Sequence, residues 1–265
     1  NDLGILSNKK SDAIKSAAKK VINGDADDHF PIDIFQTGSG TSSNMNANEV
    51  IANLASAKLK DQISPNDEVN MSQSSNDTIP TAICISALLD MKELLLPGLD
   101  VLIKEIDKKE AKLKGVVKTG RTHLMDAMPI EFSQELSAWS AQLRGCKNSL
   151  NYCFKRLSEL PQGGTAIGTG INSHKDFPKV FCPEVKKTIG ISVKPASNFY
   201  QHLAAQDVAA EASSALKNLA LALMKISNDL RWMNSGPLTG LSDIELEALQ
   251  PGSSIMPGKV NPVIP

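Results

Sequence analysis

Three long stretches of the chain carry apolar residues at alternating steps of four and three, the spacing that places them on one face of an α-helix. The longest stretch begins at Phe132 and continues without a miss through Leu136, Trp139, Leu143, Cys146, Leu150, Cys153, Leu157 and Leu160. At about 1.5 Å of rise per residue, this stripe predicts a rod of roughly 43 Å. Rods of this length are typical of a helical bundle.

Two further stripes extend the helical prediction. The later one consists of Leu216, Leu219, Leu223, Ile226, Leu230 and Met233, and it continues backwards through Ala205, Ala209 and Ala212. The earlier one consists of Leu88, Met91, Leu95, Leu99, Leu102 and Ile106. We expect Pro97 to kink this earlier helix, because proline lacks the N–H that a helix interior needs. The pattern fits a monomeric bundle or one shared between subunits, since periodicity does not count chains.

The segments between the stripes have a different character. Residues 33–43 are rich in turn formers, 64–76 are polar, 119–129 are mixed and 161–173 are rich in glycine. We therefore predict a mainly α fold, with a small N-terminal domain over residues 1–73 and a bundle of long helices over 74–265. Short connections between long rods gather at the ends of a bundle, where a site built from several loops would form.

The overall charge and composition exclude several classes of partner. The chain has 265 residues and a formal net charge of −1, which gives no reason to expect a nucleic acid or an anionic membrane surface as partner. No apolar run approaches the roughly 20 residues that span a bilayer. We expect no nucleic acid and no membrane among the partners.

Cysteine usage and the chain ends bear on the compartment. The four cysteines lack the CxxC spacing of a zinc site and the density of a secreted scaffold, so we expect thiols in a cytoplasmic, reducing compartment. The chain starts at Asn1 without a methionine and stops at Pro265 within a loop, which predicts a fragment. A mitochondrial targeting peptide would then lie outside it.

The segment Gly252–Pro262 carries the strongest candidate chemistry. It reads Gly-Ser-Ser-Ile-Met-Pro-Gly-Lys-Val-Asn-Pro, so two hydroxyls, one lysine and one asparagine lie close together without an acid. Glycine and proline make it a shaped loop rather than a helix or strand. An ordinary surface loop remains the alternative. A cationic loop with hydroxyls and some apolar residues is better interpreted as one that closes over an anion.

Two earlier segments are rich in small polar side chains. Gln36–Asn44 could offer hydroxyl and backbone donors to a carboxylate, although taken alone it is better interpreted as a capped turn before a helix that begins near Asn46. In Ser72–Asp77 we expect Asn76 or Asp77 to cap the following helix. The surplus hydroxyls then favour a ligand, and a helix N-terminus favours an anion.

His123 is the histidine with the most suggestive surroundings. It lies in Gly120–Asp126 beside an arginine, a threonine and an aspartate, in a predicted loop between helices. Histidine titrates near neutral pH, so it can move a proton in either direction. A structural or exposed histidine is the alternative. No pair of histidines has the spacing of metal ligands, so we expect no metal and no cofactor.

Taken together, these motifs resemble the fumarase/aspartase superfamily. Gly252–Pro262 resembles its signature loop, in the Gly-Lys-Val-Asn-Pro form of class II fumarases and aspartases, and the other segments match the class II fumarase pattern in order and spacing. Gly163–Gly170 and Ser235–Pro237 match it as well. The resemblance implies a fumarase-type helical bundle and a lyase that hydrates fumarate reversibly to (S)-malate without a cofactor.

The resemblance also implies roles for individual residues. Ser253 would be the base that removes the C3 proton of malate, and His123 would position or protonate the departing water. Lys259 and Asn261 would stabilise the dianionic intermediate. The residues implied in substrate binding are Ser39, Gly40, Thr41, Ser74, Ser75, Asn76, Thr122, Ser254, Lys259, Val260 and Asn261.

Some implications of the resemblance concern assembly and further sites. Family members form homotetramers whose sites draw on three chains. The tetrapeptide Ser64, Pro65, Asn66 and Asp67 resembles a second dicarboxylate site, although family members often have histidine in place of Ser64. The family's glutamate partner of the catalytic histidine would fall just past Pro265, so the chain alone is expected to be inactive.

Two alternatives remain open. Aspartase, which eliminates ammonia from aspartate, uses the same loop; the Ser-Ser-Asn-Asp run at 74–77 and His123 favour fumarase, whereas Val263-Ile264-Pro265 favours aspartase. The argininosuccinate and adenylosuccinate lyases fit the lysine loop less well. A non-enzymatic structural protein would be expected to have lost Ser253 or Lys259, and both are present.

Overall fold

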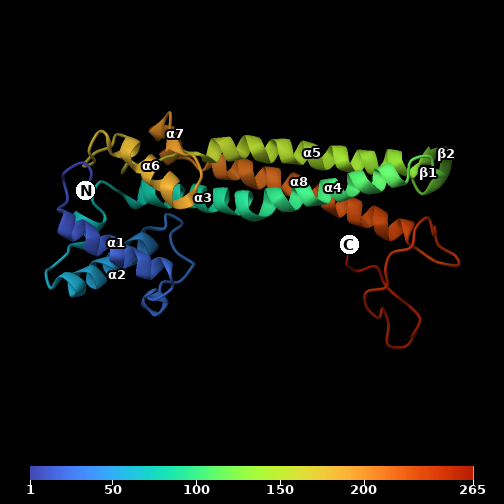
Figure 1. The fold of residues 1–265 in the computed structure, drawn as a ribbon, viewed down its shortest axis with the longest axis horizontal. Helices are drawn as coiled ribbons and strands as arrows, with labels where there is room; N and C mark the ends of the chain where they lie inside the picture. The colour runs from blue at the N-terminus through green and yellow to red at the C-terminus, as the bar shows by residue number, and fades with distance from the viewer. Residues whose placement is uncertain (265) are drawn as a thin grey trace. The chain divides into compact units, whose positions relative to one another are not determined.

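The computed structural model describes residues 1–264, and they form a mainly helical chain, as predicted (Figure 1). The α-helices are α1 (Asn8–Ile22), α2 (Thr41–Leu59), α3 (Ser75–Asp90), α4 (Leu96–Lys112), α5 (Phe132–Leu157), α6 (Phe177–Ile189), α7 (Phe199–Ala204) and α8 (Asp207–Met233). Shorter turns are the 3₁₀ turn η1 (Asp27–His29) and the π-helical turns η2 (Pro65–Val69) and η3 (Met91–Leu95). The strands are β1 (Val117–Thr122), β2 (Met125–Glu131), β3 (Glu159–Leu160) and β4 (Lys194–Pro195).

The chain divides into two compact units. Unit 1 comprises residues 1–92 and 153–211, and unit 2 comprises residues 93–152 and the chain from Ala212 onward. The division falls within η3, α5 and α8, so each unit contains two separate stretches of sequence. The proposed domain boundary at residue 73 is a different kind of division and stays a prediction.

In unit 1, helices α1 and α2 pack through small side chains. Ala13 and Ala17 of α1 lie in one buried cluster with Ala52 and Ala55 of α2 and with Ile63. Alanine on both helices lets the two backbones approach closely, and the flanking apolar residues fill the rim. This small core lies at the second half of α2, whereas the candidate site residue Thr41 lies at the start of that helix.

The apolar stripe predicted from residue 132 onward is the buried face of α5. Its members are buried except Phe132 and Cys146, which are half-buried. The helix ends at Leu157, and Leu160 belongs to β3, which pairs in parallel with β4. In unit 2, α4 is joined to α5 by Asp107, which accepts hydrogen bonds from Ser140 and Arg144.

The earlier stripe departs from the prediction at one position. Leu102 is 37% exposed, whereas Ile103 is 4% exposed. The predicted positions on either side, Leu99 and Ile106, are both buried, so the buried face of α4 takes a step of four and then a step of three, from Leu99 through Ile103 to Ile106. Pro97 lies in the first turn of α4, directly after η3, where a missing N–H is tolerated.

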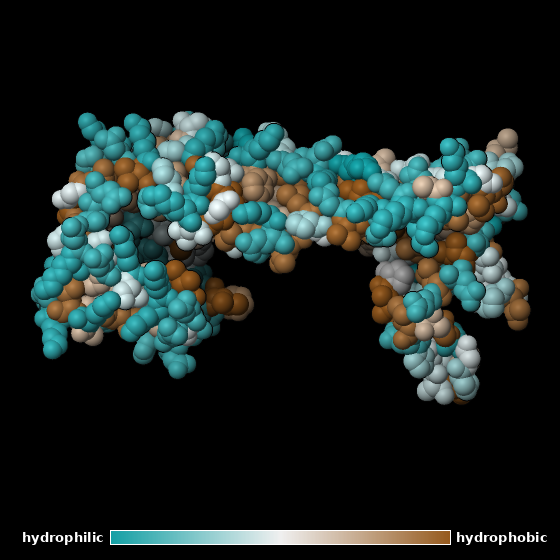
Figure 2. Space-filling model, in the orientation of Figure 1, coloured by the Kyte–Doolittle hydropathy of each residue, from teal (hydrophilic) through white to brown (hydrophobic). Residues whose placement is uncertain are grey.

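The later stripe is only half buried. Helix α8 begins at Asp207, so Ala205 precedes it, contrary to the prediction. Leu219, Ile226 and Met233 are buried at intervals of seven, whereas Leu216 and Leu223 remain exposed. Figure 2 shows hydrophobic residues in brown among hydrophilic ones in teal along the long helices. Among residues 1–264, no helix is long and apolar enough to cross a membrane.

Candidate active site

Unit 1 brings together the hydroxyl residues of two predicted binding segments. A chain of hydrogen bonds runs from Thr37 Oγ1 to Ser39 Oγ over 3.1 Å, on to Thr41 Oγ1 over 3.0 Å, and from there to Ser75 Oγ over 3.0 Å. Thr41 is the first residue of α2 and Ser75 is the first residue of α3. The two helix N-termini therefore meet at a row of exposed hydroxyls, where their N–H groups and dipoles favour an anion.

Gly40 makes this meeting of helices sterically feasible. Its backbone is left-handed, with φ 69°, and a Cβ placed there would lie 2.8 Å from Ile79 Cγ1 of α3. Only glycine combines that backbone with so close an approach. Helix α2 consequently begins at Thr41 rather than near Asn46 as predicted, and Gly40 caps it without a side chain.

The cap of α3 also differs from the prediction. Ser74 is the N-cap residue, and its Oγ accepts a hydrogen bond from the N–H of Asn76 over 3.2 Å. Asp77 completes a capping box, because its Oδ1 accepts the N–H of Ser74 over 2.9 Å. The serine-to-aspartate spacing of three was the sequence signal for this arrangement. Asn76 is left exposed, with its side-chain Nδ2 donating to the carbonyl of Ala166 over 2.9 Å.

Asp77 does more than cap its own helix. Its side chain is fully buried, and Oδ2 accepts the backbone N–H groups of Gly163 and Thr165, each over 2.9 Å. The carboxylate thus binds the glycine-rich loop Gly163–Gly170 to the start of α3. Sequence reasoning considered Asp77 only as a helix cap, because nothing in a sequence reveals a contact with a loop 86 residues away.

Unit 2 carries Thr122 and His123 on a β-hairpin. Strands β1 and β2 pair antiparallel and replace the loop that was predicted between two helices. His123 and Leu124 form the two-residue turn, with φ values of 52° and 63°. A turn with two positive φ values normally contains asparagine or glycine, so histidine and leucine here are strained. Both side chains are exposed at the tip.

A cluster of charges holds the base of this hairpin. Arg121 donates from Nη1 to Asp243 Oδ2 over 2.7 Å, and Lys118 Nζ lies 3.2 Å from the same oxygen. Burial raises the pKa of Asp243, but the hydrogen bonds and charges of Arg121 and Lys118 outweigh it and leave that pKa below its usual value. Asp243 therefore stays ionised and joins the hairpin to the segment that leads into the signature loop.

The signature loop closes on itself within unit 2. The Gly252 N–H donates to the carbonyl of Lys259 over 2.9 Å, and Asn261 Nδ2 donates to the carbonyl of Gly252 over 3.0 Å. A Cβ on Gly252 would lie 2.6 Å from the nitrogen of Asn261, so no other residue fits. The loop is thus a preformed ring rather than an extended strand.

Within the ring, Ser253 and Lys259 have distinct environments. Ser253 Oγ accepts the N–H groups of Ile255 over 3.3 Å and Met256 over 3.2 Å. Lys259 is exposed, and no carboxylate lies within ion-pair distance of it among residues 1–264. Ser254 and Val260 are exposed as well. The ring presents a hydroxyl and an uncompensated positive charge.

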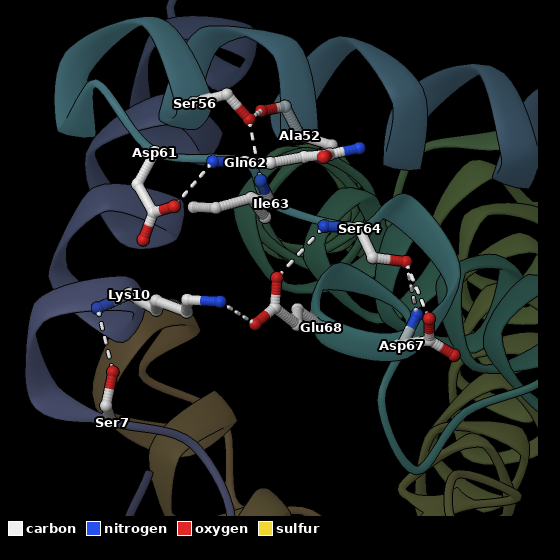
Figure 3. A network of polar contacts seen from close by, with 10 residues as sticks. All are labelled: Ser7, Lys10, Ala52, Ser56, Asp61, Gln62, Ile63, Ser64, Asp67 and Glu68. Carbon is white, nitrogen blue, oxygen red and sulfur yellow. Dashed lines mark hydrogen bonds and ion pairs between the residues drawn. The ribbon is translucent and has the colours of Figure 1, made fainter.

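The segment proposed as a second dicarboxylate site already uses its polar groups internally (Figure 3). Ser64 Oγ accepts the Asp67 N–H over 3.1 Å and donates to Asp67 Oδ2 over 3.0 Å, as the cap of η2. The Ser64 N–H donates to Glu68, which forms an ion pair with Lys10. Pro65 lies in the first turn of η2, and Asn66 is exposed. A binding role for this segment stays a prediction.

The predicted site residues thus form two groups. Unit 1 holds Ser39, Gly40, Thr41, Ser74, Ser75 and Asn76, and unit 2 holds Thr122, His123, Ser253, Ser254, Lys259, Val260 and Asn261. Within each unit the geometry above is defined residue by residue. Asp77 and Asp243 are the two supporting residues that the sequence prediction missed.

Comparison with known proteins gives the family. The sequence profile of a lyase family matches residues 1–265. The chain belongs to this lyase family. The lyase chain is 58% identical over 264 residues to the class II fumarate hydratase of Xylella fastidiosa, covering 100% of the chain and 56% of that protein. It is 54% identical over 254 residues to class II fumarate hydratase 2 of Pseudomonas aeruginosa, covering 96% of the chain and 56% of that protein.

A solved structure supports the same relationship. The crystal structure of a class II fumarase from Schistosoma mansoni superposes with a TM-score of 0.94 at 40% identity, covering 98% of this lyase chain and 59% of that chain. These matches confirm the predicted resemblance to class II fumarases and the long-helix fold. The chain spans little more than half the length of the curated relatives it matches.

Proposed function

We propose that the natural polypeptide carrying this chain is a class II fumarate hydratase, which hydrates fumarate reversibly to (S)-malate. The observation that carries the proposal is the row of hydroxyls at the adjoining N-termini of α2 and α3. Such a row offers neutral donors and two helix dipoles to a carboxylate, without a lysine that would favour a phosphate. The identity of 58% to a protein named fumarate hydratase supports the same substrate.

In this proposal the unit 1 residues grip the substrate carboxylates. Thr41 and Ser75 donate hydroxyl hydrogen bonds, and Ser39, Ser74 and Asn76 extend the set of donors. Gly40 contributes by keeping the start of α2 against α3. Thr122, in the strand that ends at the hairpin tip, is assigned to the second carboxylate by the resemblance.

Ser253 is the proposed base. It removes the proton from C3 of malate, and the electron pair moves into the adjacent carboxylate to give a dianionic intermediate. The N–H groups of Ile255 and Met256 already point at Ser253 Oγ and stabilise negative charge on it. Lys259 stabilises the intermediate by its charge, assisted by Asn261, whose amide also closes the loop.

His123 is the proposed partner for the departing water. The C2–O bond breaks, and a proton delivered through His123 turns the leaving hydroxide into water. The strained turn supports this role, because a histidine held at positive φ on an exposed tip costs about 1–3 kcal/mol that an Asn-Gly turn would avoid. Strain of this kind gathers at functional sites, and here it accompanies a histidine that is exposed at the tip of the hairpin.

The assay uses the natural polypeptide with fumarate, first alone and then with ammonium, while the absorbance of the double bond is followed. Loss of absorbance without ammonium is expected. Loss only with ammonium would instead identify an aspartase, and no loss in either case would favour a non-enzymatic protein.

Replacement of the base then tests the mechanism. Ser253→Ala is expected to lower kcat by at least about 10²-fold, because general base catalysis contributes about 10²–10⁴ in rate. Ser149→Ala, an exposed serine of α5, is the matched control and should retain full activity. Retained turnover in Ser253→Ala would refute its role as base.

We further propose a homotetramer and a reducing, cytoplasmic compartment. The exposed residues Leu216 and Leu223 continue the apolar stripe of α8 and support contact with other subunits. The described cysteines are all free thiols, and burial raises the pKa of Cys84 and Cys182 to about 11, so both stay protonated and unreactive.

A further inference from the structure

A buried carboxylate whose short hydrogen bonds all come from backbone N–H groups lies next to the hydroxyls proposed to bind the substrate carboxylates; a longer side-chain contact comes from Thr78 Oγ1, 3.5 Å from Asp77 Oδ1. Asp77 is 0% exposed and accepts N–H groups from Ser74, Gly163 and Thr165. No lysine, arginine or histidine is within ion-pair distance of it among residues 1–264. A buried carboxylate is costly unless hydrogen bonds compensate for the lost hydration, so all three contacts are needed.

The three donors come from two separate loops. Ser74 belongs to the turn that precedes α3, and Gly163 and Thr165 belong to the glycine loop Gly163–Gly170. The same two segments meet again where Asn76 Nδ2 donates to the carbonyl of Ala166. One carboxylate and one amide therefore bind the turn to the loop at two points.

The glycine loop is itself held from the opposite side. A Cβ on Gly168, whose φ is 98°, would lie 2.8 Å from a ring carbon of Tyr200 and 3.0 Å from its backbone nitrogen. A Cβ on Gly163 would lie 2.3 Å from Pro178. The loop is thus closely packed against Tyr200 and Pro178, and a shift of the loop would require these neighbours to move as well.

We propose that Asp77 is a positioning residue for substrate binding, which fixes Ser75 and Asn76 against the glycine loop so that both present their polar groups to a substrate carboxylate. The inference rests on the proposed fumarate hydratase activity and adds a residue to it. Asp77 itself does not touch the substrate, because it is fully buried.

The first test is Asp77→Asn in the natural polypeptide. An asparagine of the same size places an NH₂ group against at least one of the three N–H donors, so the turn shifts while the core stays filled. KM for fumarate is expected to rise about tenfold, equivalent to about 1.4 kcal/mol of binding, and kcat is expected to fall less than about threefold. The affinity for succinate, a dicarboxylate that cannot be hydrated, should fall by a similar factor.

A stability control separates positioning from folding. Leu88 is fully buried on the same helix and is not one of the residues proposed to bind the substrate carboxylates. Leu88→Val and Leu88→Ala are therefore expected to lower the melting temperature without moving the turn that precedes α3. Their KM is expected to match the wild type at a loss of melting temperature that brackets that of Asp77→Asn. An unchanged KM in Asp77→Asn, or an equal rise in the Leu88 variants, would overturn the inference.

A second variant decides the question if Asp77→Asn does not fold. Gly168→Ala pushes the glycine loop away from Tyr200 without touching Asp77, and KM should rise about threefold or more. Gly4→Ala is the matched control, since Gly4 also has a positive φ but open space around it. A KM in Gly168→Ala equal to that of Gly4→Ala would refute the proposal that the glycine loop positions the substrate-binding residues.

The wild-type assay distinguishes this inference from the proposed function. If the wild type does not hydrate fumarate, the proposed function itself is wrong. If the wild type does hydrate fumarate, the variants test only the role of Asp77.

Discussion

Two carboxylates hold backbone segments in place by different means. Asp77 accepts three backbone N–H groups and, over 3.5 Å, the Thr78 hydroxyl, all of them neutral donors, so its contribution depends on geometry and not on neighbouring charges. Asp243 instead accepts from Arg121 and Lys118, which are both largely buried. The pairing of Asp243 makes the hairpin base sensitive to pH, because protonation of the carboxyl removes its charge.

The pH dependence has a definite sign. The pKa of Asp243 is lower in the folded protein than in the unfolded chain, so its stabilising contribution is present above the unfolded value of about 3.9 and is lost as pH falls through the folded value. Asp243→Asn should therefore cost about 2 kcal/mol in the free energy of unfolding at pH 7. The difference from wild type should shrink in acid. Denaturant titrations at pH 7 and in acid measure it.

Asp126→Asn provides the control for this experiment. Asp126 lies 3.7 Å from the same arginine, but its side chain is 83% exposed. An exposed pair of this kind contributes at most about 1 kcal/mol, so the variant should be nearly as stable as wild type. An equal loss in both variants would show that burial of Asp243 is not the cause.

At the residue scale, the sequence predicted which residues are candidates for the site better than it predicted the contacts that those residues make. Ser253 and Thr41 were singled out by the resemblance to the family, whereas His123 was singled out by its polar neighbours as well. The supporting contacts of Asp77 and Asp243 were not predicted, since their partners lie 86 and 122 residues away in sequence. The exchange of the predicted caps Asn76 and Asp77 for Ser74 is a local error that the Ser-x-x-Asp spacing could have prevented.

At the element scale, hydrophobic periodicity predicted α5 almost completely. Leu143 lies on its buried face with no exposed surface. Leu143→Ala should lower the free energy of unfolding by about 2–5 kcal/mol, because it removes buried methyl groups and leaves a cavity. Gln142→Ala, an exposed neighbour on the same helix, should change it by less than about 0.5 kcal/mol. Thermal and denaturant melts compare the two; equal effects would contradict the assignment of the buried face.

Two elements escaped the periodic analysis for physical reasons. The π-helical turn η3 contains no residue type that marks such a turn in a sequence, so the periodic pattern did not reveal it. The β-hairpin lacks the Asn-Gly or Asp-Gly signal of a two-residue turn, because His123 and Leu124 occupy the positive-φ positions instead. The presence of His123 and Leu124 at these two positions therefore explains both the missing turn signal and the backbone strain.

At the scale of the whole molecule, part of the apolar stripe of α8 is not buried within the single chain. Leu216 and Leu223 are 45% and 36% exposed, although both follow the spacing of buried neighbours. If the proposed tetramer covers them, a charge there will disrupt assembly. Leu223→Glu should shift the natural polypeptide towards smaller species in sedimentation velocity, whereas Lys217→Glu, at an exposed polar position of the same helix, should not. Equal mass in both variants would refute the involvement of this face.

The sequence also predicted the mainly helical architecture, because long stripes leave few alternatives. It could not predict that each compact unit is assembled from two separate stretches of chain. Periodicity reports which face of an element is buried, and it carries no information about which distant element buries it.

The contact between Asp77 and the glycine loop has a consequence for biosynthesis. When a nascent chain has emerged from the ribosome only as far as α3, the capping residue Ser74 and the hydroxyl residues near it are already present. Residues 163–165, whose N–H groups donate to the Asp77 carboxylate, have not yet been synthesised. Until they emerge, Asp77 must remain hydrated and the turn before α3 lacks its support. Translation stalled before residue 163 would leave the turn open to protease, and resumption past the glycine loop would protect it.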